Sequence, residues 1–129
     1  MLYNIERHPE LPALIATWHS NFKYSRDARA YVTDMHEWLE RQETPIYYVL
    51  DLRNWHDMTF DELILAAHNA TRSKSSNFHH PMNMGNLVIT NDPTVKLSVE
   101  GLRSDVFGNA KTLIFSELED AINYIRQAL

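Results

Sequence analysis

A group of polar residues directly follows an apolar run in the middle of the chain and contains the strongest candidates for chemistry. The apolar run covers residues 46–52, and the polar residues after it are Arg53, Asn54, His56, Asp57 and Thr59. His19 ends one other predicted strand and Asp92 follows another. Because parallel strands end at one edge of a sheet, these groups could converge. An arginine there would suit an anionic ligand. Two imidazoles with two carboxylates would suit a metal, but no set with metal-ligand spacing occurs on one element, so we expect no metal.

Two neighbouring residues each allow two interpretations. Trp55 lies in the same polar turn. If its indole is exposed beside Arg53, it suits a protein partner or a flat apolar ligand, because aromatic residues and arginine are enriched at binding hot spots. If it is buried, it covers the end of the sheet. Asp51 follows buried residues and could act as a base with a raised pKa, or it could accept backbone N–H groups of the next turn.

The remaining histidines give weaker signals. Adjacent side chains in an extended segment point in opposite directions, so His79 and His80 are unsuited to binding one ion, and we expect both to be solvated in a loop. His36 and His68 fall beside apolar stripes of predicted helices and are interpreted as boundary residues. The chain has no glycine-rich phosphate loop, no Gly-x-Ser-x-Gly elbow and no His-Glu-x-x-His motif. We therefore expect neither an enzyme nor a cofactor.

Composition limits the class of protein. The chain has 129 residues, no cysteine and a formal net charge of −5. That length fits one domain, residues 1–129, and the lack of cysteine excludes disulfides, iron–sulfur clusters and thiol catalysis. The negative charge argues against a nucleic-acid surface. Neither a membrane span nor a signal peptide is recognisable, so we expect a cytoplasmic protein.

The elements that must position these groups follow from periodicity and from helix signals. Strands are predicted at residues 2–7 and 13–19, which form an antiparallel hairpin, and at 46–52, 86–90 and 112–115. A helix is predicted over 25–42, with an inward stripe of Ala28, Tyr31, Val32, Met35, Trp38 and Leu39. Further helices begin at the capping boxes Thr59–Glu62 and Ser116–Glu119 and at Asp92-Pro93. Residues 73–82 are predicted to be a mobile polar loop.

This order is β-β-α-β-α-β-α-β-α. It predicts an α/β fold with a mostly parallel five-stranded sheet, an antiparallel N-terminal hairpin and helices on the faces. The second helix would turn Phe60, Leu63, Ile64, Ala67 and Thr71 inward. The last helix would turn inward Leu118, Ala121, Ile122, Ile125 and Leu129.

Two stretches carry a family resemblance. Tyr-Tyr-Val-Leu-Asp-Leu-Arg at residues 47–53, followed by a helix, and Lys-Thr-Leu-Ile-Phe-Ser-Glu-Leu-Glu-Asp-Ala-Ile-Asn-Tyr-Ile at residues 111–125 resemble the STAS superfamily, and its SpoIIAA-like branch in particular. That branch shares features with lipid-binding CRAL-TRIO domains. The resemblance implies a regulatory module whose partner is a kinase or another regulatory protein. STAS antagonists usually carry a phosphorylated serine in an Asp-Ser-Ser-Gly-like turn, whereas residues 57–61 here contain no serine or glycine.

Thr59 is the only hydroxyl that could replace that serine. A phosphate at a helix N-terminus meets backbone N–H groups and a favourable dipole. The alternative is that Thr59 serves only as an N-cap.

The sequence thus predicts a non-enzymatic STAS-like module that docks a protein partner through the turn at residues 53–61 and the start of the second helix, and that could form a homodimer. The alternative is a carrier of a small molecule or lipid. Its pocket would be lined by aromatics that could equally fill the interior: Tyr31, Trp38, Tyr47, Tyr48 and Phe60.

Overall fold

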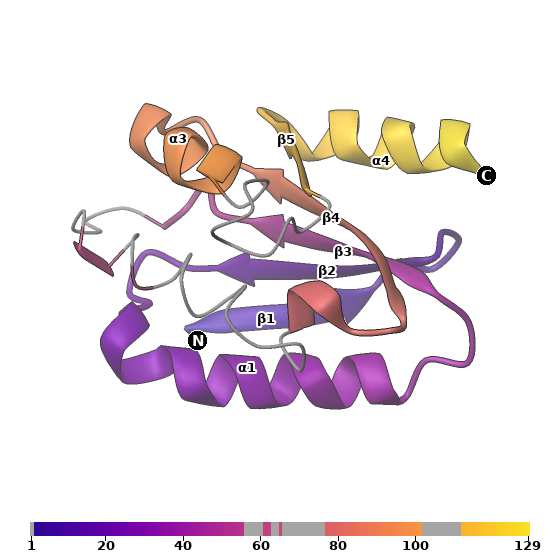
Figure 1. The fold of residues 1–129 in the computed structure, drawn as a ribbon, viewed down its shortest axis with the longest axis horizontal. Coiled ribbons are helices and arrows are strands. Elements are labelled where there is room, and N and C mark those ends of the chain that lie inside the picture. Colours follow the sequence, from indigo (N-terminus) through magenta and orange to yellow (C-terminus); the bar gives the residue numbers. More distant parts are fainter. Residues whose placement is uncertain (1, 56–60, 63–64, 66–76, 102–111) are drawn as a thin grey trace.

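The computed structural model describes residues 2–55, 61–62, 65, 77–101 and 112–129 of the chain. Helices lie against the faces of one central sheet (Figure 1). The elements, in chain order, are β1 (Tyr3–Arg7), β2 (Ala13–Trp18), α1 (Tyr24–Glu40), β3 (Ile46–Asp51), the short 3₁₀ helix η1 (Asn77–His79), β4 (Asn83–Ile89), α3 (Pro93–Gly101), β5 (Thr112–Phe115) and α4 (Leu118–Ala128).

The sheet confirms the predicted fold class. Its strands lie in the order β1-β2-β3-β4-β5. β1 pairs with β2 in antiparallel fashion, with Tyr3 opposite Trp18, and the other neighbouring strands are parallel. The short connection between β1 and β2 permits only a hairpin, whereas parallel neighbours need a crossover over one face of the sheet. The helices therefore cover both faces.

Each face of the sheet has its own apolar core. On one face, Tyr31, Met35 and Leu39 of α1 pack with alternate residues of β2 and β3 such as Leu14 and Tyr48. On the other face, Ala121 and Ile125 of α4 pack with the intervening strand residues, among them Ile15, Val49 and Leu87. Because strand side chains alternate between the faces, the almost wholly apolar β3 contributes to both cores.

The inward stripe of α1 differs from the prediction at Val32. Tyr31, Met35 and Leu39 are buried as expected, Ala28 and Trp38 are partly buried against the same core, and Val32 is 48% exposed. Asp27 is buried instead. Asp27 lies four residues before Tyr31, so it shares that residue's face of the helix, whereas Val32 is turned about 100° away from Tyr31.

One of the predicted helix starts was confirmed and another was wrong. Asp92 caps α3, and Pro93 is its first residue, as predicted. The capping box at Ser116 was wrong, because α4 begins at Leu118 and its N-cap is Glu117, whose side chain makes no cap hydrogen bond. Leu129 is also 69% exposed rather than inward. The box at Thr59 and the predicted inward residues of the second helix lie outside the described residues.

The described part of the predicted loop, residues 77–82, is more structured than expected, and residues 73–76 lie outside the described residues. Residues 77–79 form η1, and β4 begins at Asn83, three residues earlier than predicted. Asn83 pairs with Ile46 at the start of β3, and Gly85 then pairs with Tyr47. Pairing with β3 thus extends β4 beyond the residues whose apolar character indicated a strand.

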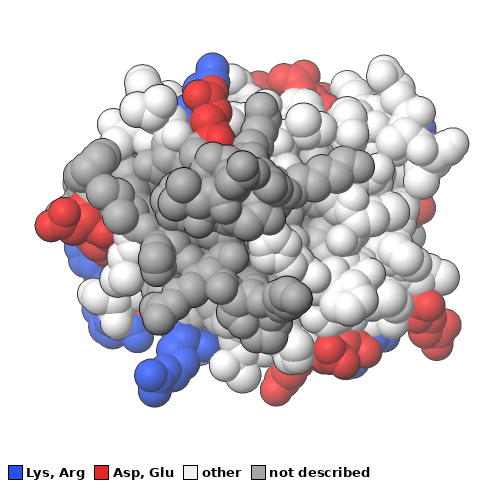
Figure 2. Space-filling model, viewed as in Figure 1, with Lys and Arg blue, Asp and Glu red and all other residues white. Residues whose placement is uncertain are grey.

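Charged side chains are unevenly placed on the surface. On the face shown in Figure 2, the described Lys and Arg side chains stand at the margin, and the middle of the described right-hand part is largely uncharged. The described residues therefore form no broad basic area on this face, in keeping with the net charge of −5. In the part of the chain that the structure describes, no helix has both the length and the apolar character needed to span a bilayer.

Candidate functional site

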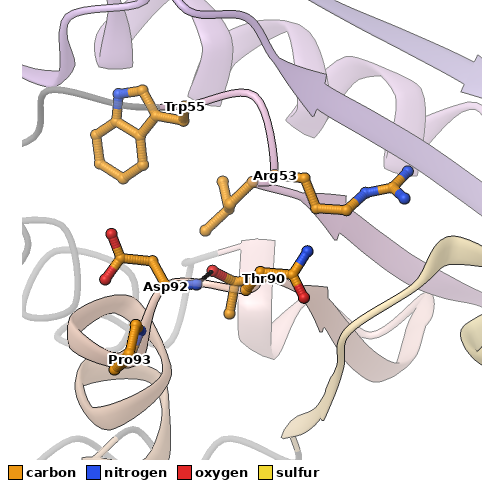
Figure 3. A pocket seen from close by; sticks show the side chains of 7 residues that line it. Arg53, Trp55, Thr90, Asp92 and Pro93 are labelled. Carbon is orange, nitrogen blue, oxygen red and sulfur yellow. Dashed lines mark hydrogen bonds between the residues drawn. The ribbon is translucent and has the colours of Figure 1, made fainter.

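A groove lies where β3 and β4 end, at the carboxyl edge of the sheet (Figure 3). Its volume is about 320 Å³, and it is partly open to solvent. Two segments line it: Leu52, Arg53 and Trp55 after β3, and Thr90, Asn91, Asp92 and Pro93 after β4. Open α/β sheets generally bind ligands at this edge, beyond the carboxyl ends of parallel strands.

The guanidinium group of Arg53 is held by two carboxylates. Its Nε donates to Oδ1 of Asp51 at 3.0 Å, and its Nη2 donates to Oδ2 at 2.8 Å. Its Nη1 donates to Oε2 of Glu117 at 3.1 Å. The hydrogen bonds to Asp51 are the main cause of the raised pKa of Arg53. Figure 3 shows the guanidinium directed away from Trp55 and Asp92, so the predicted anion-binding arginine instead joins the end of β3 to the start of α4.

Of its two predicted roles, base or acceptor of backbone N–H groups in the next turn, Asp51 takes the role of acceptor. Besides the guanidinium, its Oδ1 accepts the backbone N–H of Arg53 at 3.1 Å. The residue is only 4% exposed. Asp51 therefore fixes the turn after β3 rather than standing open to a substrate.

The structure also decides whether Trp55 is exposed or buried. It is 3% exposed, and its Nε1 donates to the carbonyl oxygen of Phe22 at 3.1 Å. Its ring meets Trp18 and Phe22 edge to face, with centroid distances of 4.9 and 6.2 Å. The indole covers the end of the sheet, and its edge forms one wall of the groove.

The opposite wall is built around the start of α3. The Asp92 N–H donates to Oγ1 of Thr90 at 3.1 Å (Figure 3). Oδ1 of Asp92 accepts the N–H of Thr94 at 2.8 Å, which satisfies a backbone donor at the helix N-terminus. Both walls are thus held by hydrogen bonds within the chain.

The predicted convergence at this edge is seen for Arg53 and Asp92, which line the same groove. Asn54 is exposed next to the groove but does not line it. His19 is directed elsewhere, with Nε2 2.9 Å from Oδ1 of Asn4 on β1. His56, Asp57 and Thr59 lie outside the described residues.

Sequence reasoning missed part of the groove. Leu52, Thr90, Asn91 and Pro93 line it but were not candidates. The available signal was their position. Leu52 and Thr90 are the last residues of predicted parallel strands, Asn91 and Pro93 follow one, and such strands end at a common edge.

The expectation of two solvated histidines was wrong for His80. His79 is partly exposed, but His80 is only 7% exposed, and its Nε2 lies 2.7 Å from Oε1 of Glu40. This hydrogen bond is the main cause of the lowered pKa of Glu40. His36, interpreted as a boundary residue, lies on α1 with its side chain 47% exposed, and His68 lies outside the described residues.

Comparison with known proteins identifies the fold. No family model matches the sequence, and no curated protein matches it at a significant level. Among solved structures, the chain is similar to an uncharacterised protein of the DUF3478 family from Shewanella loihica PV-4, which is described as having a SpoIIAA-like fold. The two are 12% identical, the match covers 95% of this chain and 91% of that chain, and the TM-score is 0.55. The protein therefore has a SpoIIAA-like fold of the kind that the sequence resemblance implied.

Proposed function

We propose that this protein is a non-enzymatic regulatory module that docks a protein partner over the groove at the carboxyl edge of its sheet. The observation that carries the proposal is the groove itself, with one wall after β3 and the other after β4. It coincides with the first part of the turn at residues 53–61 that the sequence predicts as a docking segment.

The rigidity of the groove supports docking. Asp51 and Glu117 fix Arg53, the carbonyl of Phe22 fixes Trp55, and Asp92 caps α3. Such walls lose little conformational entropy when a partner binds, which leaves more of the contact energy for affinity. Leu52, Trp55 and Pro93 add apolar surface between polar groups, the composition expected for a pocket that receives one anchoring side chain.

The same hydrogen bonds support a role other than catalysis. A general base must reach the proton that it removes, and an electrophilic group must face the reacting atom. In the described part of the groove, the carboxylate of Asp92 caps a helix and the guanidinium of Arg53 pairs with Asp51 and Glu117. These groups maintain the fold, so we assign no reaction to them.

Packing under α1 favours docking over transport of a lipid. Tyr31 and Tyr48 are both buried, and their hydroxyl groups are hydrogen-bonded to each other. Tyr48 also meets Phe78 edge to face, with ring centroids 5.4 Å apart. These rings occupy the space that a pocket lined by them would require. The groove, at about 320 Å³, is at the lower end of the volumes of small-molecule sites, which run from about 300 to 1,000 Å³.

Site-specific photo-crosslinking in the host cell tests the proposal. A photoreactive amino acid would replace Asn91, which is exposed and lines the groove, or Asn54, which is exposed next to it. Matched controls would carry it at Glu10 or Glu43, which are exposed before β2 and β3, at the opposite edge of the sheet. We expect one and the same protein to be captured from both groove positions and from neither control.

The captured partner then permits a quantitative test. Asn91→Arg places a long side chain in the groove and should weaken binding of the purified partner about tenfold or more, the scale of a blocked hot spot. Glu43→Arg should leave the affinity unchanged. Equal capture from groove and control positions would contradict the docking site. A small molecule that remains bound in native mass spectrometry would instead favour the carrier function.

A further inference from the structure

Three side chains that can bind a metal meet at the C-terminal end of α1. His36 and Glu40 are four residues apart and therefore share one face of the helix. His80 reaches them from the turn that follows η1. Nε2 of His80 lies 2.7 Å from Oε1 of Glu40, and Nε2 of His36 lies 3.5 Å from the same oxygen. One ligand atom from each residue lies within 4.8 Å of the other two.

We propose that His36, Glu40 and His80 bind a divalent transition-metal ion of the zinc class, with a further coordination position open to water or another ligand. Two imidazoles and one carboxylate form a donor set that zinc commonly takes in proteins. Calcium and magnesium prefer sites made of oxygen ligands, so this set discriminates against them.

The geometry is close to what such an ion requires. With zinc–ligand bonds of about 2.0–2.1 Å, the ligand atoms of a tetrahedral site are about 3.3 Å apart. The two separations from Glu40, 2.7 and 3.5 Å, lie on either side of that value. The side chains of His36 and Glu40 are 47% and 58% exposed, so both can adjust their rotamers. His80, with 7% of its side chain exposed, supplies the fixed ligand.

Metal binding would leave a signature at the turn after His80. Without metal, the Met82 N–H donates to Nδ1 of His80 at 3.0 Å, so the proton of the neutral ring lies on Nε2 and faces Glu40. A neutral imidazole has one proton, and coordination through Nε2 therefore requires that proton on Nδ1. The hydrogen bond from Met82 is then lost. The hydrogen bond between His80 and Glu40 is lost as well, because a coordinated Nε2 carries no proton. Two hydrogen bonds are exchanged for three coordinate bonds, and the environment of the Met82 amide changes.

Zinc titration of the whole, untagged chain tests the proposal, since a polyhistidine tag would itself bind zinc. Isothermal titration calorimetry with zinc chloride should show one equivalent bound. His36→Asn and Glu40→Gln change exposed side chains, and each should weaken binding about tenfold or more. In ¹⁵N NMR spectra, the Met82 amide signal should shift as zinc is added. Cobalt(II) in place of zinc should give the visible absorption of a four-coordinate site.

Matched controls separate this site from other histidines and carboxylates. His79→Asn alters the residue next to His80, and Glu37→Gln alters another exposed carboxylate of α1. Both should bind zinc like the unmodified chain, and magnesium should produce no heat or shift. His80→Asn should abolish binding while circular dichroism shows that the fold is kept.

Three outcomes overturn the proposal. The first is that zinc does not saturate the chain at concentrations up to about 1 mM. The second is that His36→Asn and Glu40→Gln each change the affinity less than about twofold, which would place the metal elsewhere. The third is that His79→Asn removes binding. None of these outcomes affects the docking groove, which lies at the other edge of the sheet and is tested by crosslinking.

Discussion

At the scale of single residues, the ion pair between Arg53 and Asp51 decides how the candidate site is built. Asp51 is buried at the end of β3, where an unpaired carboxylate is costly. Arg53 satisfies both carboxylate oxygens and extends to Glu117. A residue that looked like an anion-binding group is therefore a structural one, because its partners lie at the end of β3 and at the N-cap position of α4.

Arg53→Ala should lower the free energy of unfolding by about 2 kcal/mol. The substitution leaves Asp51 buried without its cation, which costs about 3–5 kcal/mol in fully buried pairs, and the partial exposure of Arg53 reduces that figure. Glu117→Gln removes only the exposed half of the network and should cost at most about 0.5 kcal/mol. Urea unfolding at pH 7 measures both. Equal losses in the two variants would show that Asp51 does not depend on Arg53.

At the scale of elements, the cap of α3 connects helix stability to the shape of the groove. Asp92 satisfies backbone donors of α3, and it also forms part of the groove wall. A carboxylate at a helix N-terminus is favoured by the helix dipole as well as by the hydrogen bond. Loss of the cap should therefore loosen both the helix and the wall.

Asp92→Ala should cost about 1 kcal/mol of unfolding free energy, the typical value for loss of an N-cap. Asp92→Asn should cost much less, because asparagine caps helices about as well as aspartate. Thermal unfolding monitored by circular dichroism gives the comparison. If the alanine variant is as stable as the asparagine variant, the hydrogen bond at Thr94 does not stabilise α3.

At the scale of the whole molecule, the aromatic core under α1 predicts how stability depends on alkaline pH. The pKa of Tyr3 is raised from 10.0 to about 12, mainly by burial and secondly by the hydrogen bond to Asp34. Burial also raises the pKa values of Tyr31 and Tyr48, whose hydroxyl groups are hydrogen-bonded to each other. Unfolding would let these phenols ionise near their ordinary pKa of about 10.

The contribution of these phenols to the free energy of unfolding should therefore be complete below about pH 10. It should decline as the pH rises toward about 12, because only the unfolded chain loses these protons in that range. For each pH unit above about 10, each such tyrosine lowers the free energy of unfolding by up to about 1.4 kcal/mol. The double variant Tyr31→Phe with Tyr48→Phe removes both hydroxyls together and leaves neither unpaired. Its urea-derived stability should fall less steeply between pH 10 and 12. Identical slopes would exclude these two phenols as the cause.

Much of this fold was predictable because its signals are local. The alternation of strands and helices, the hairpin at β1 and β2, the last strand at Thr112–Phe115 and the cap at Asp92 all follow from neighbouring residues. The hairpin and the helix cap each depend on residues a few positions apart, so a short stretch of sequence is enough to predict them. The prediction for the start of β4 was wrong because pairing with β3 extends the strand. The predictions for Val32 and Ser116 were also wrong, since Val32 is exposed and α4 begins only at Leu118.

The sequence by itself determined the α/β fold and the sheet edge at which a site was to be sought. Tertiary structure alone decided what the candidate side chains do there. Arg53 turns to Asp51 and Glu117, Trp55 turns to Phe22, and His80 turns to Glu40. Glu117 and Arg53 are 64 residues apart, and His80 and Glu40 are 40 apart. No local pattern specifies such contacts, because they depend on how the packed layers bring distant segments together.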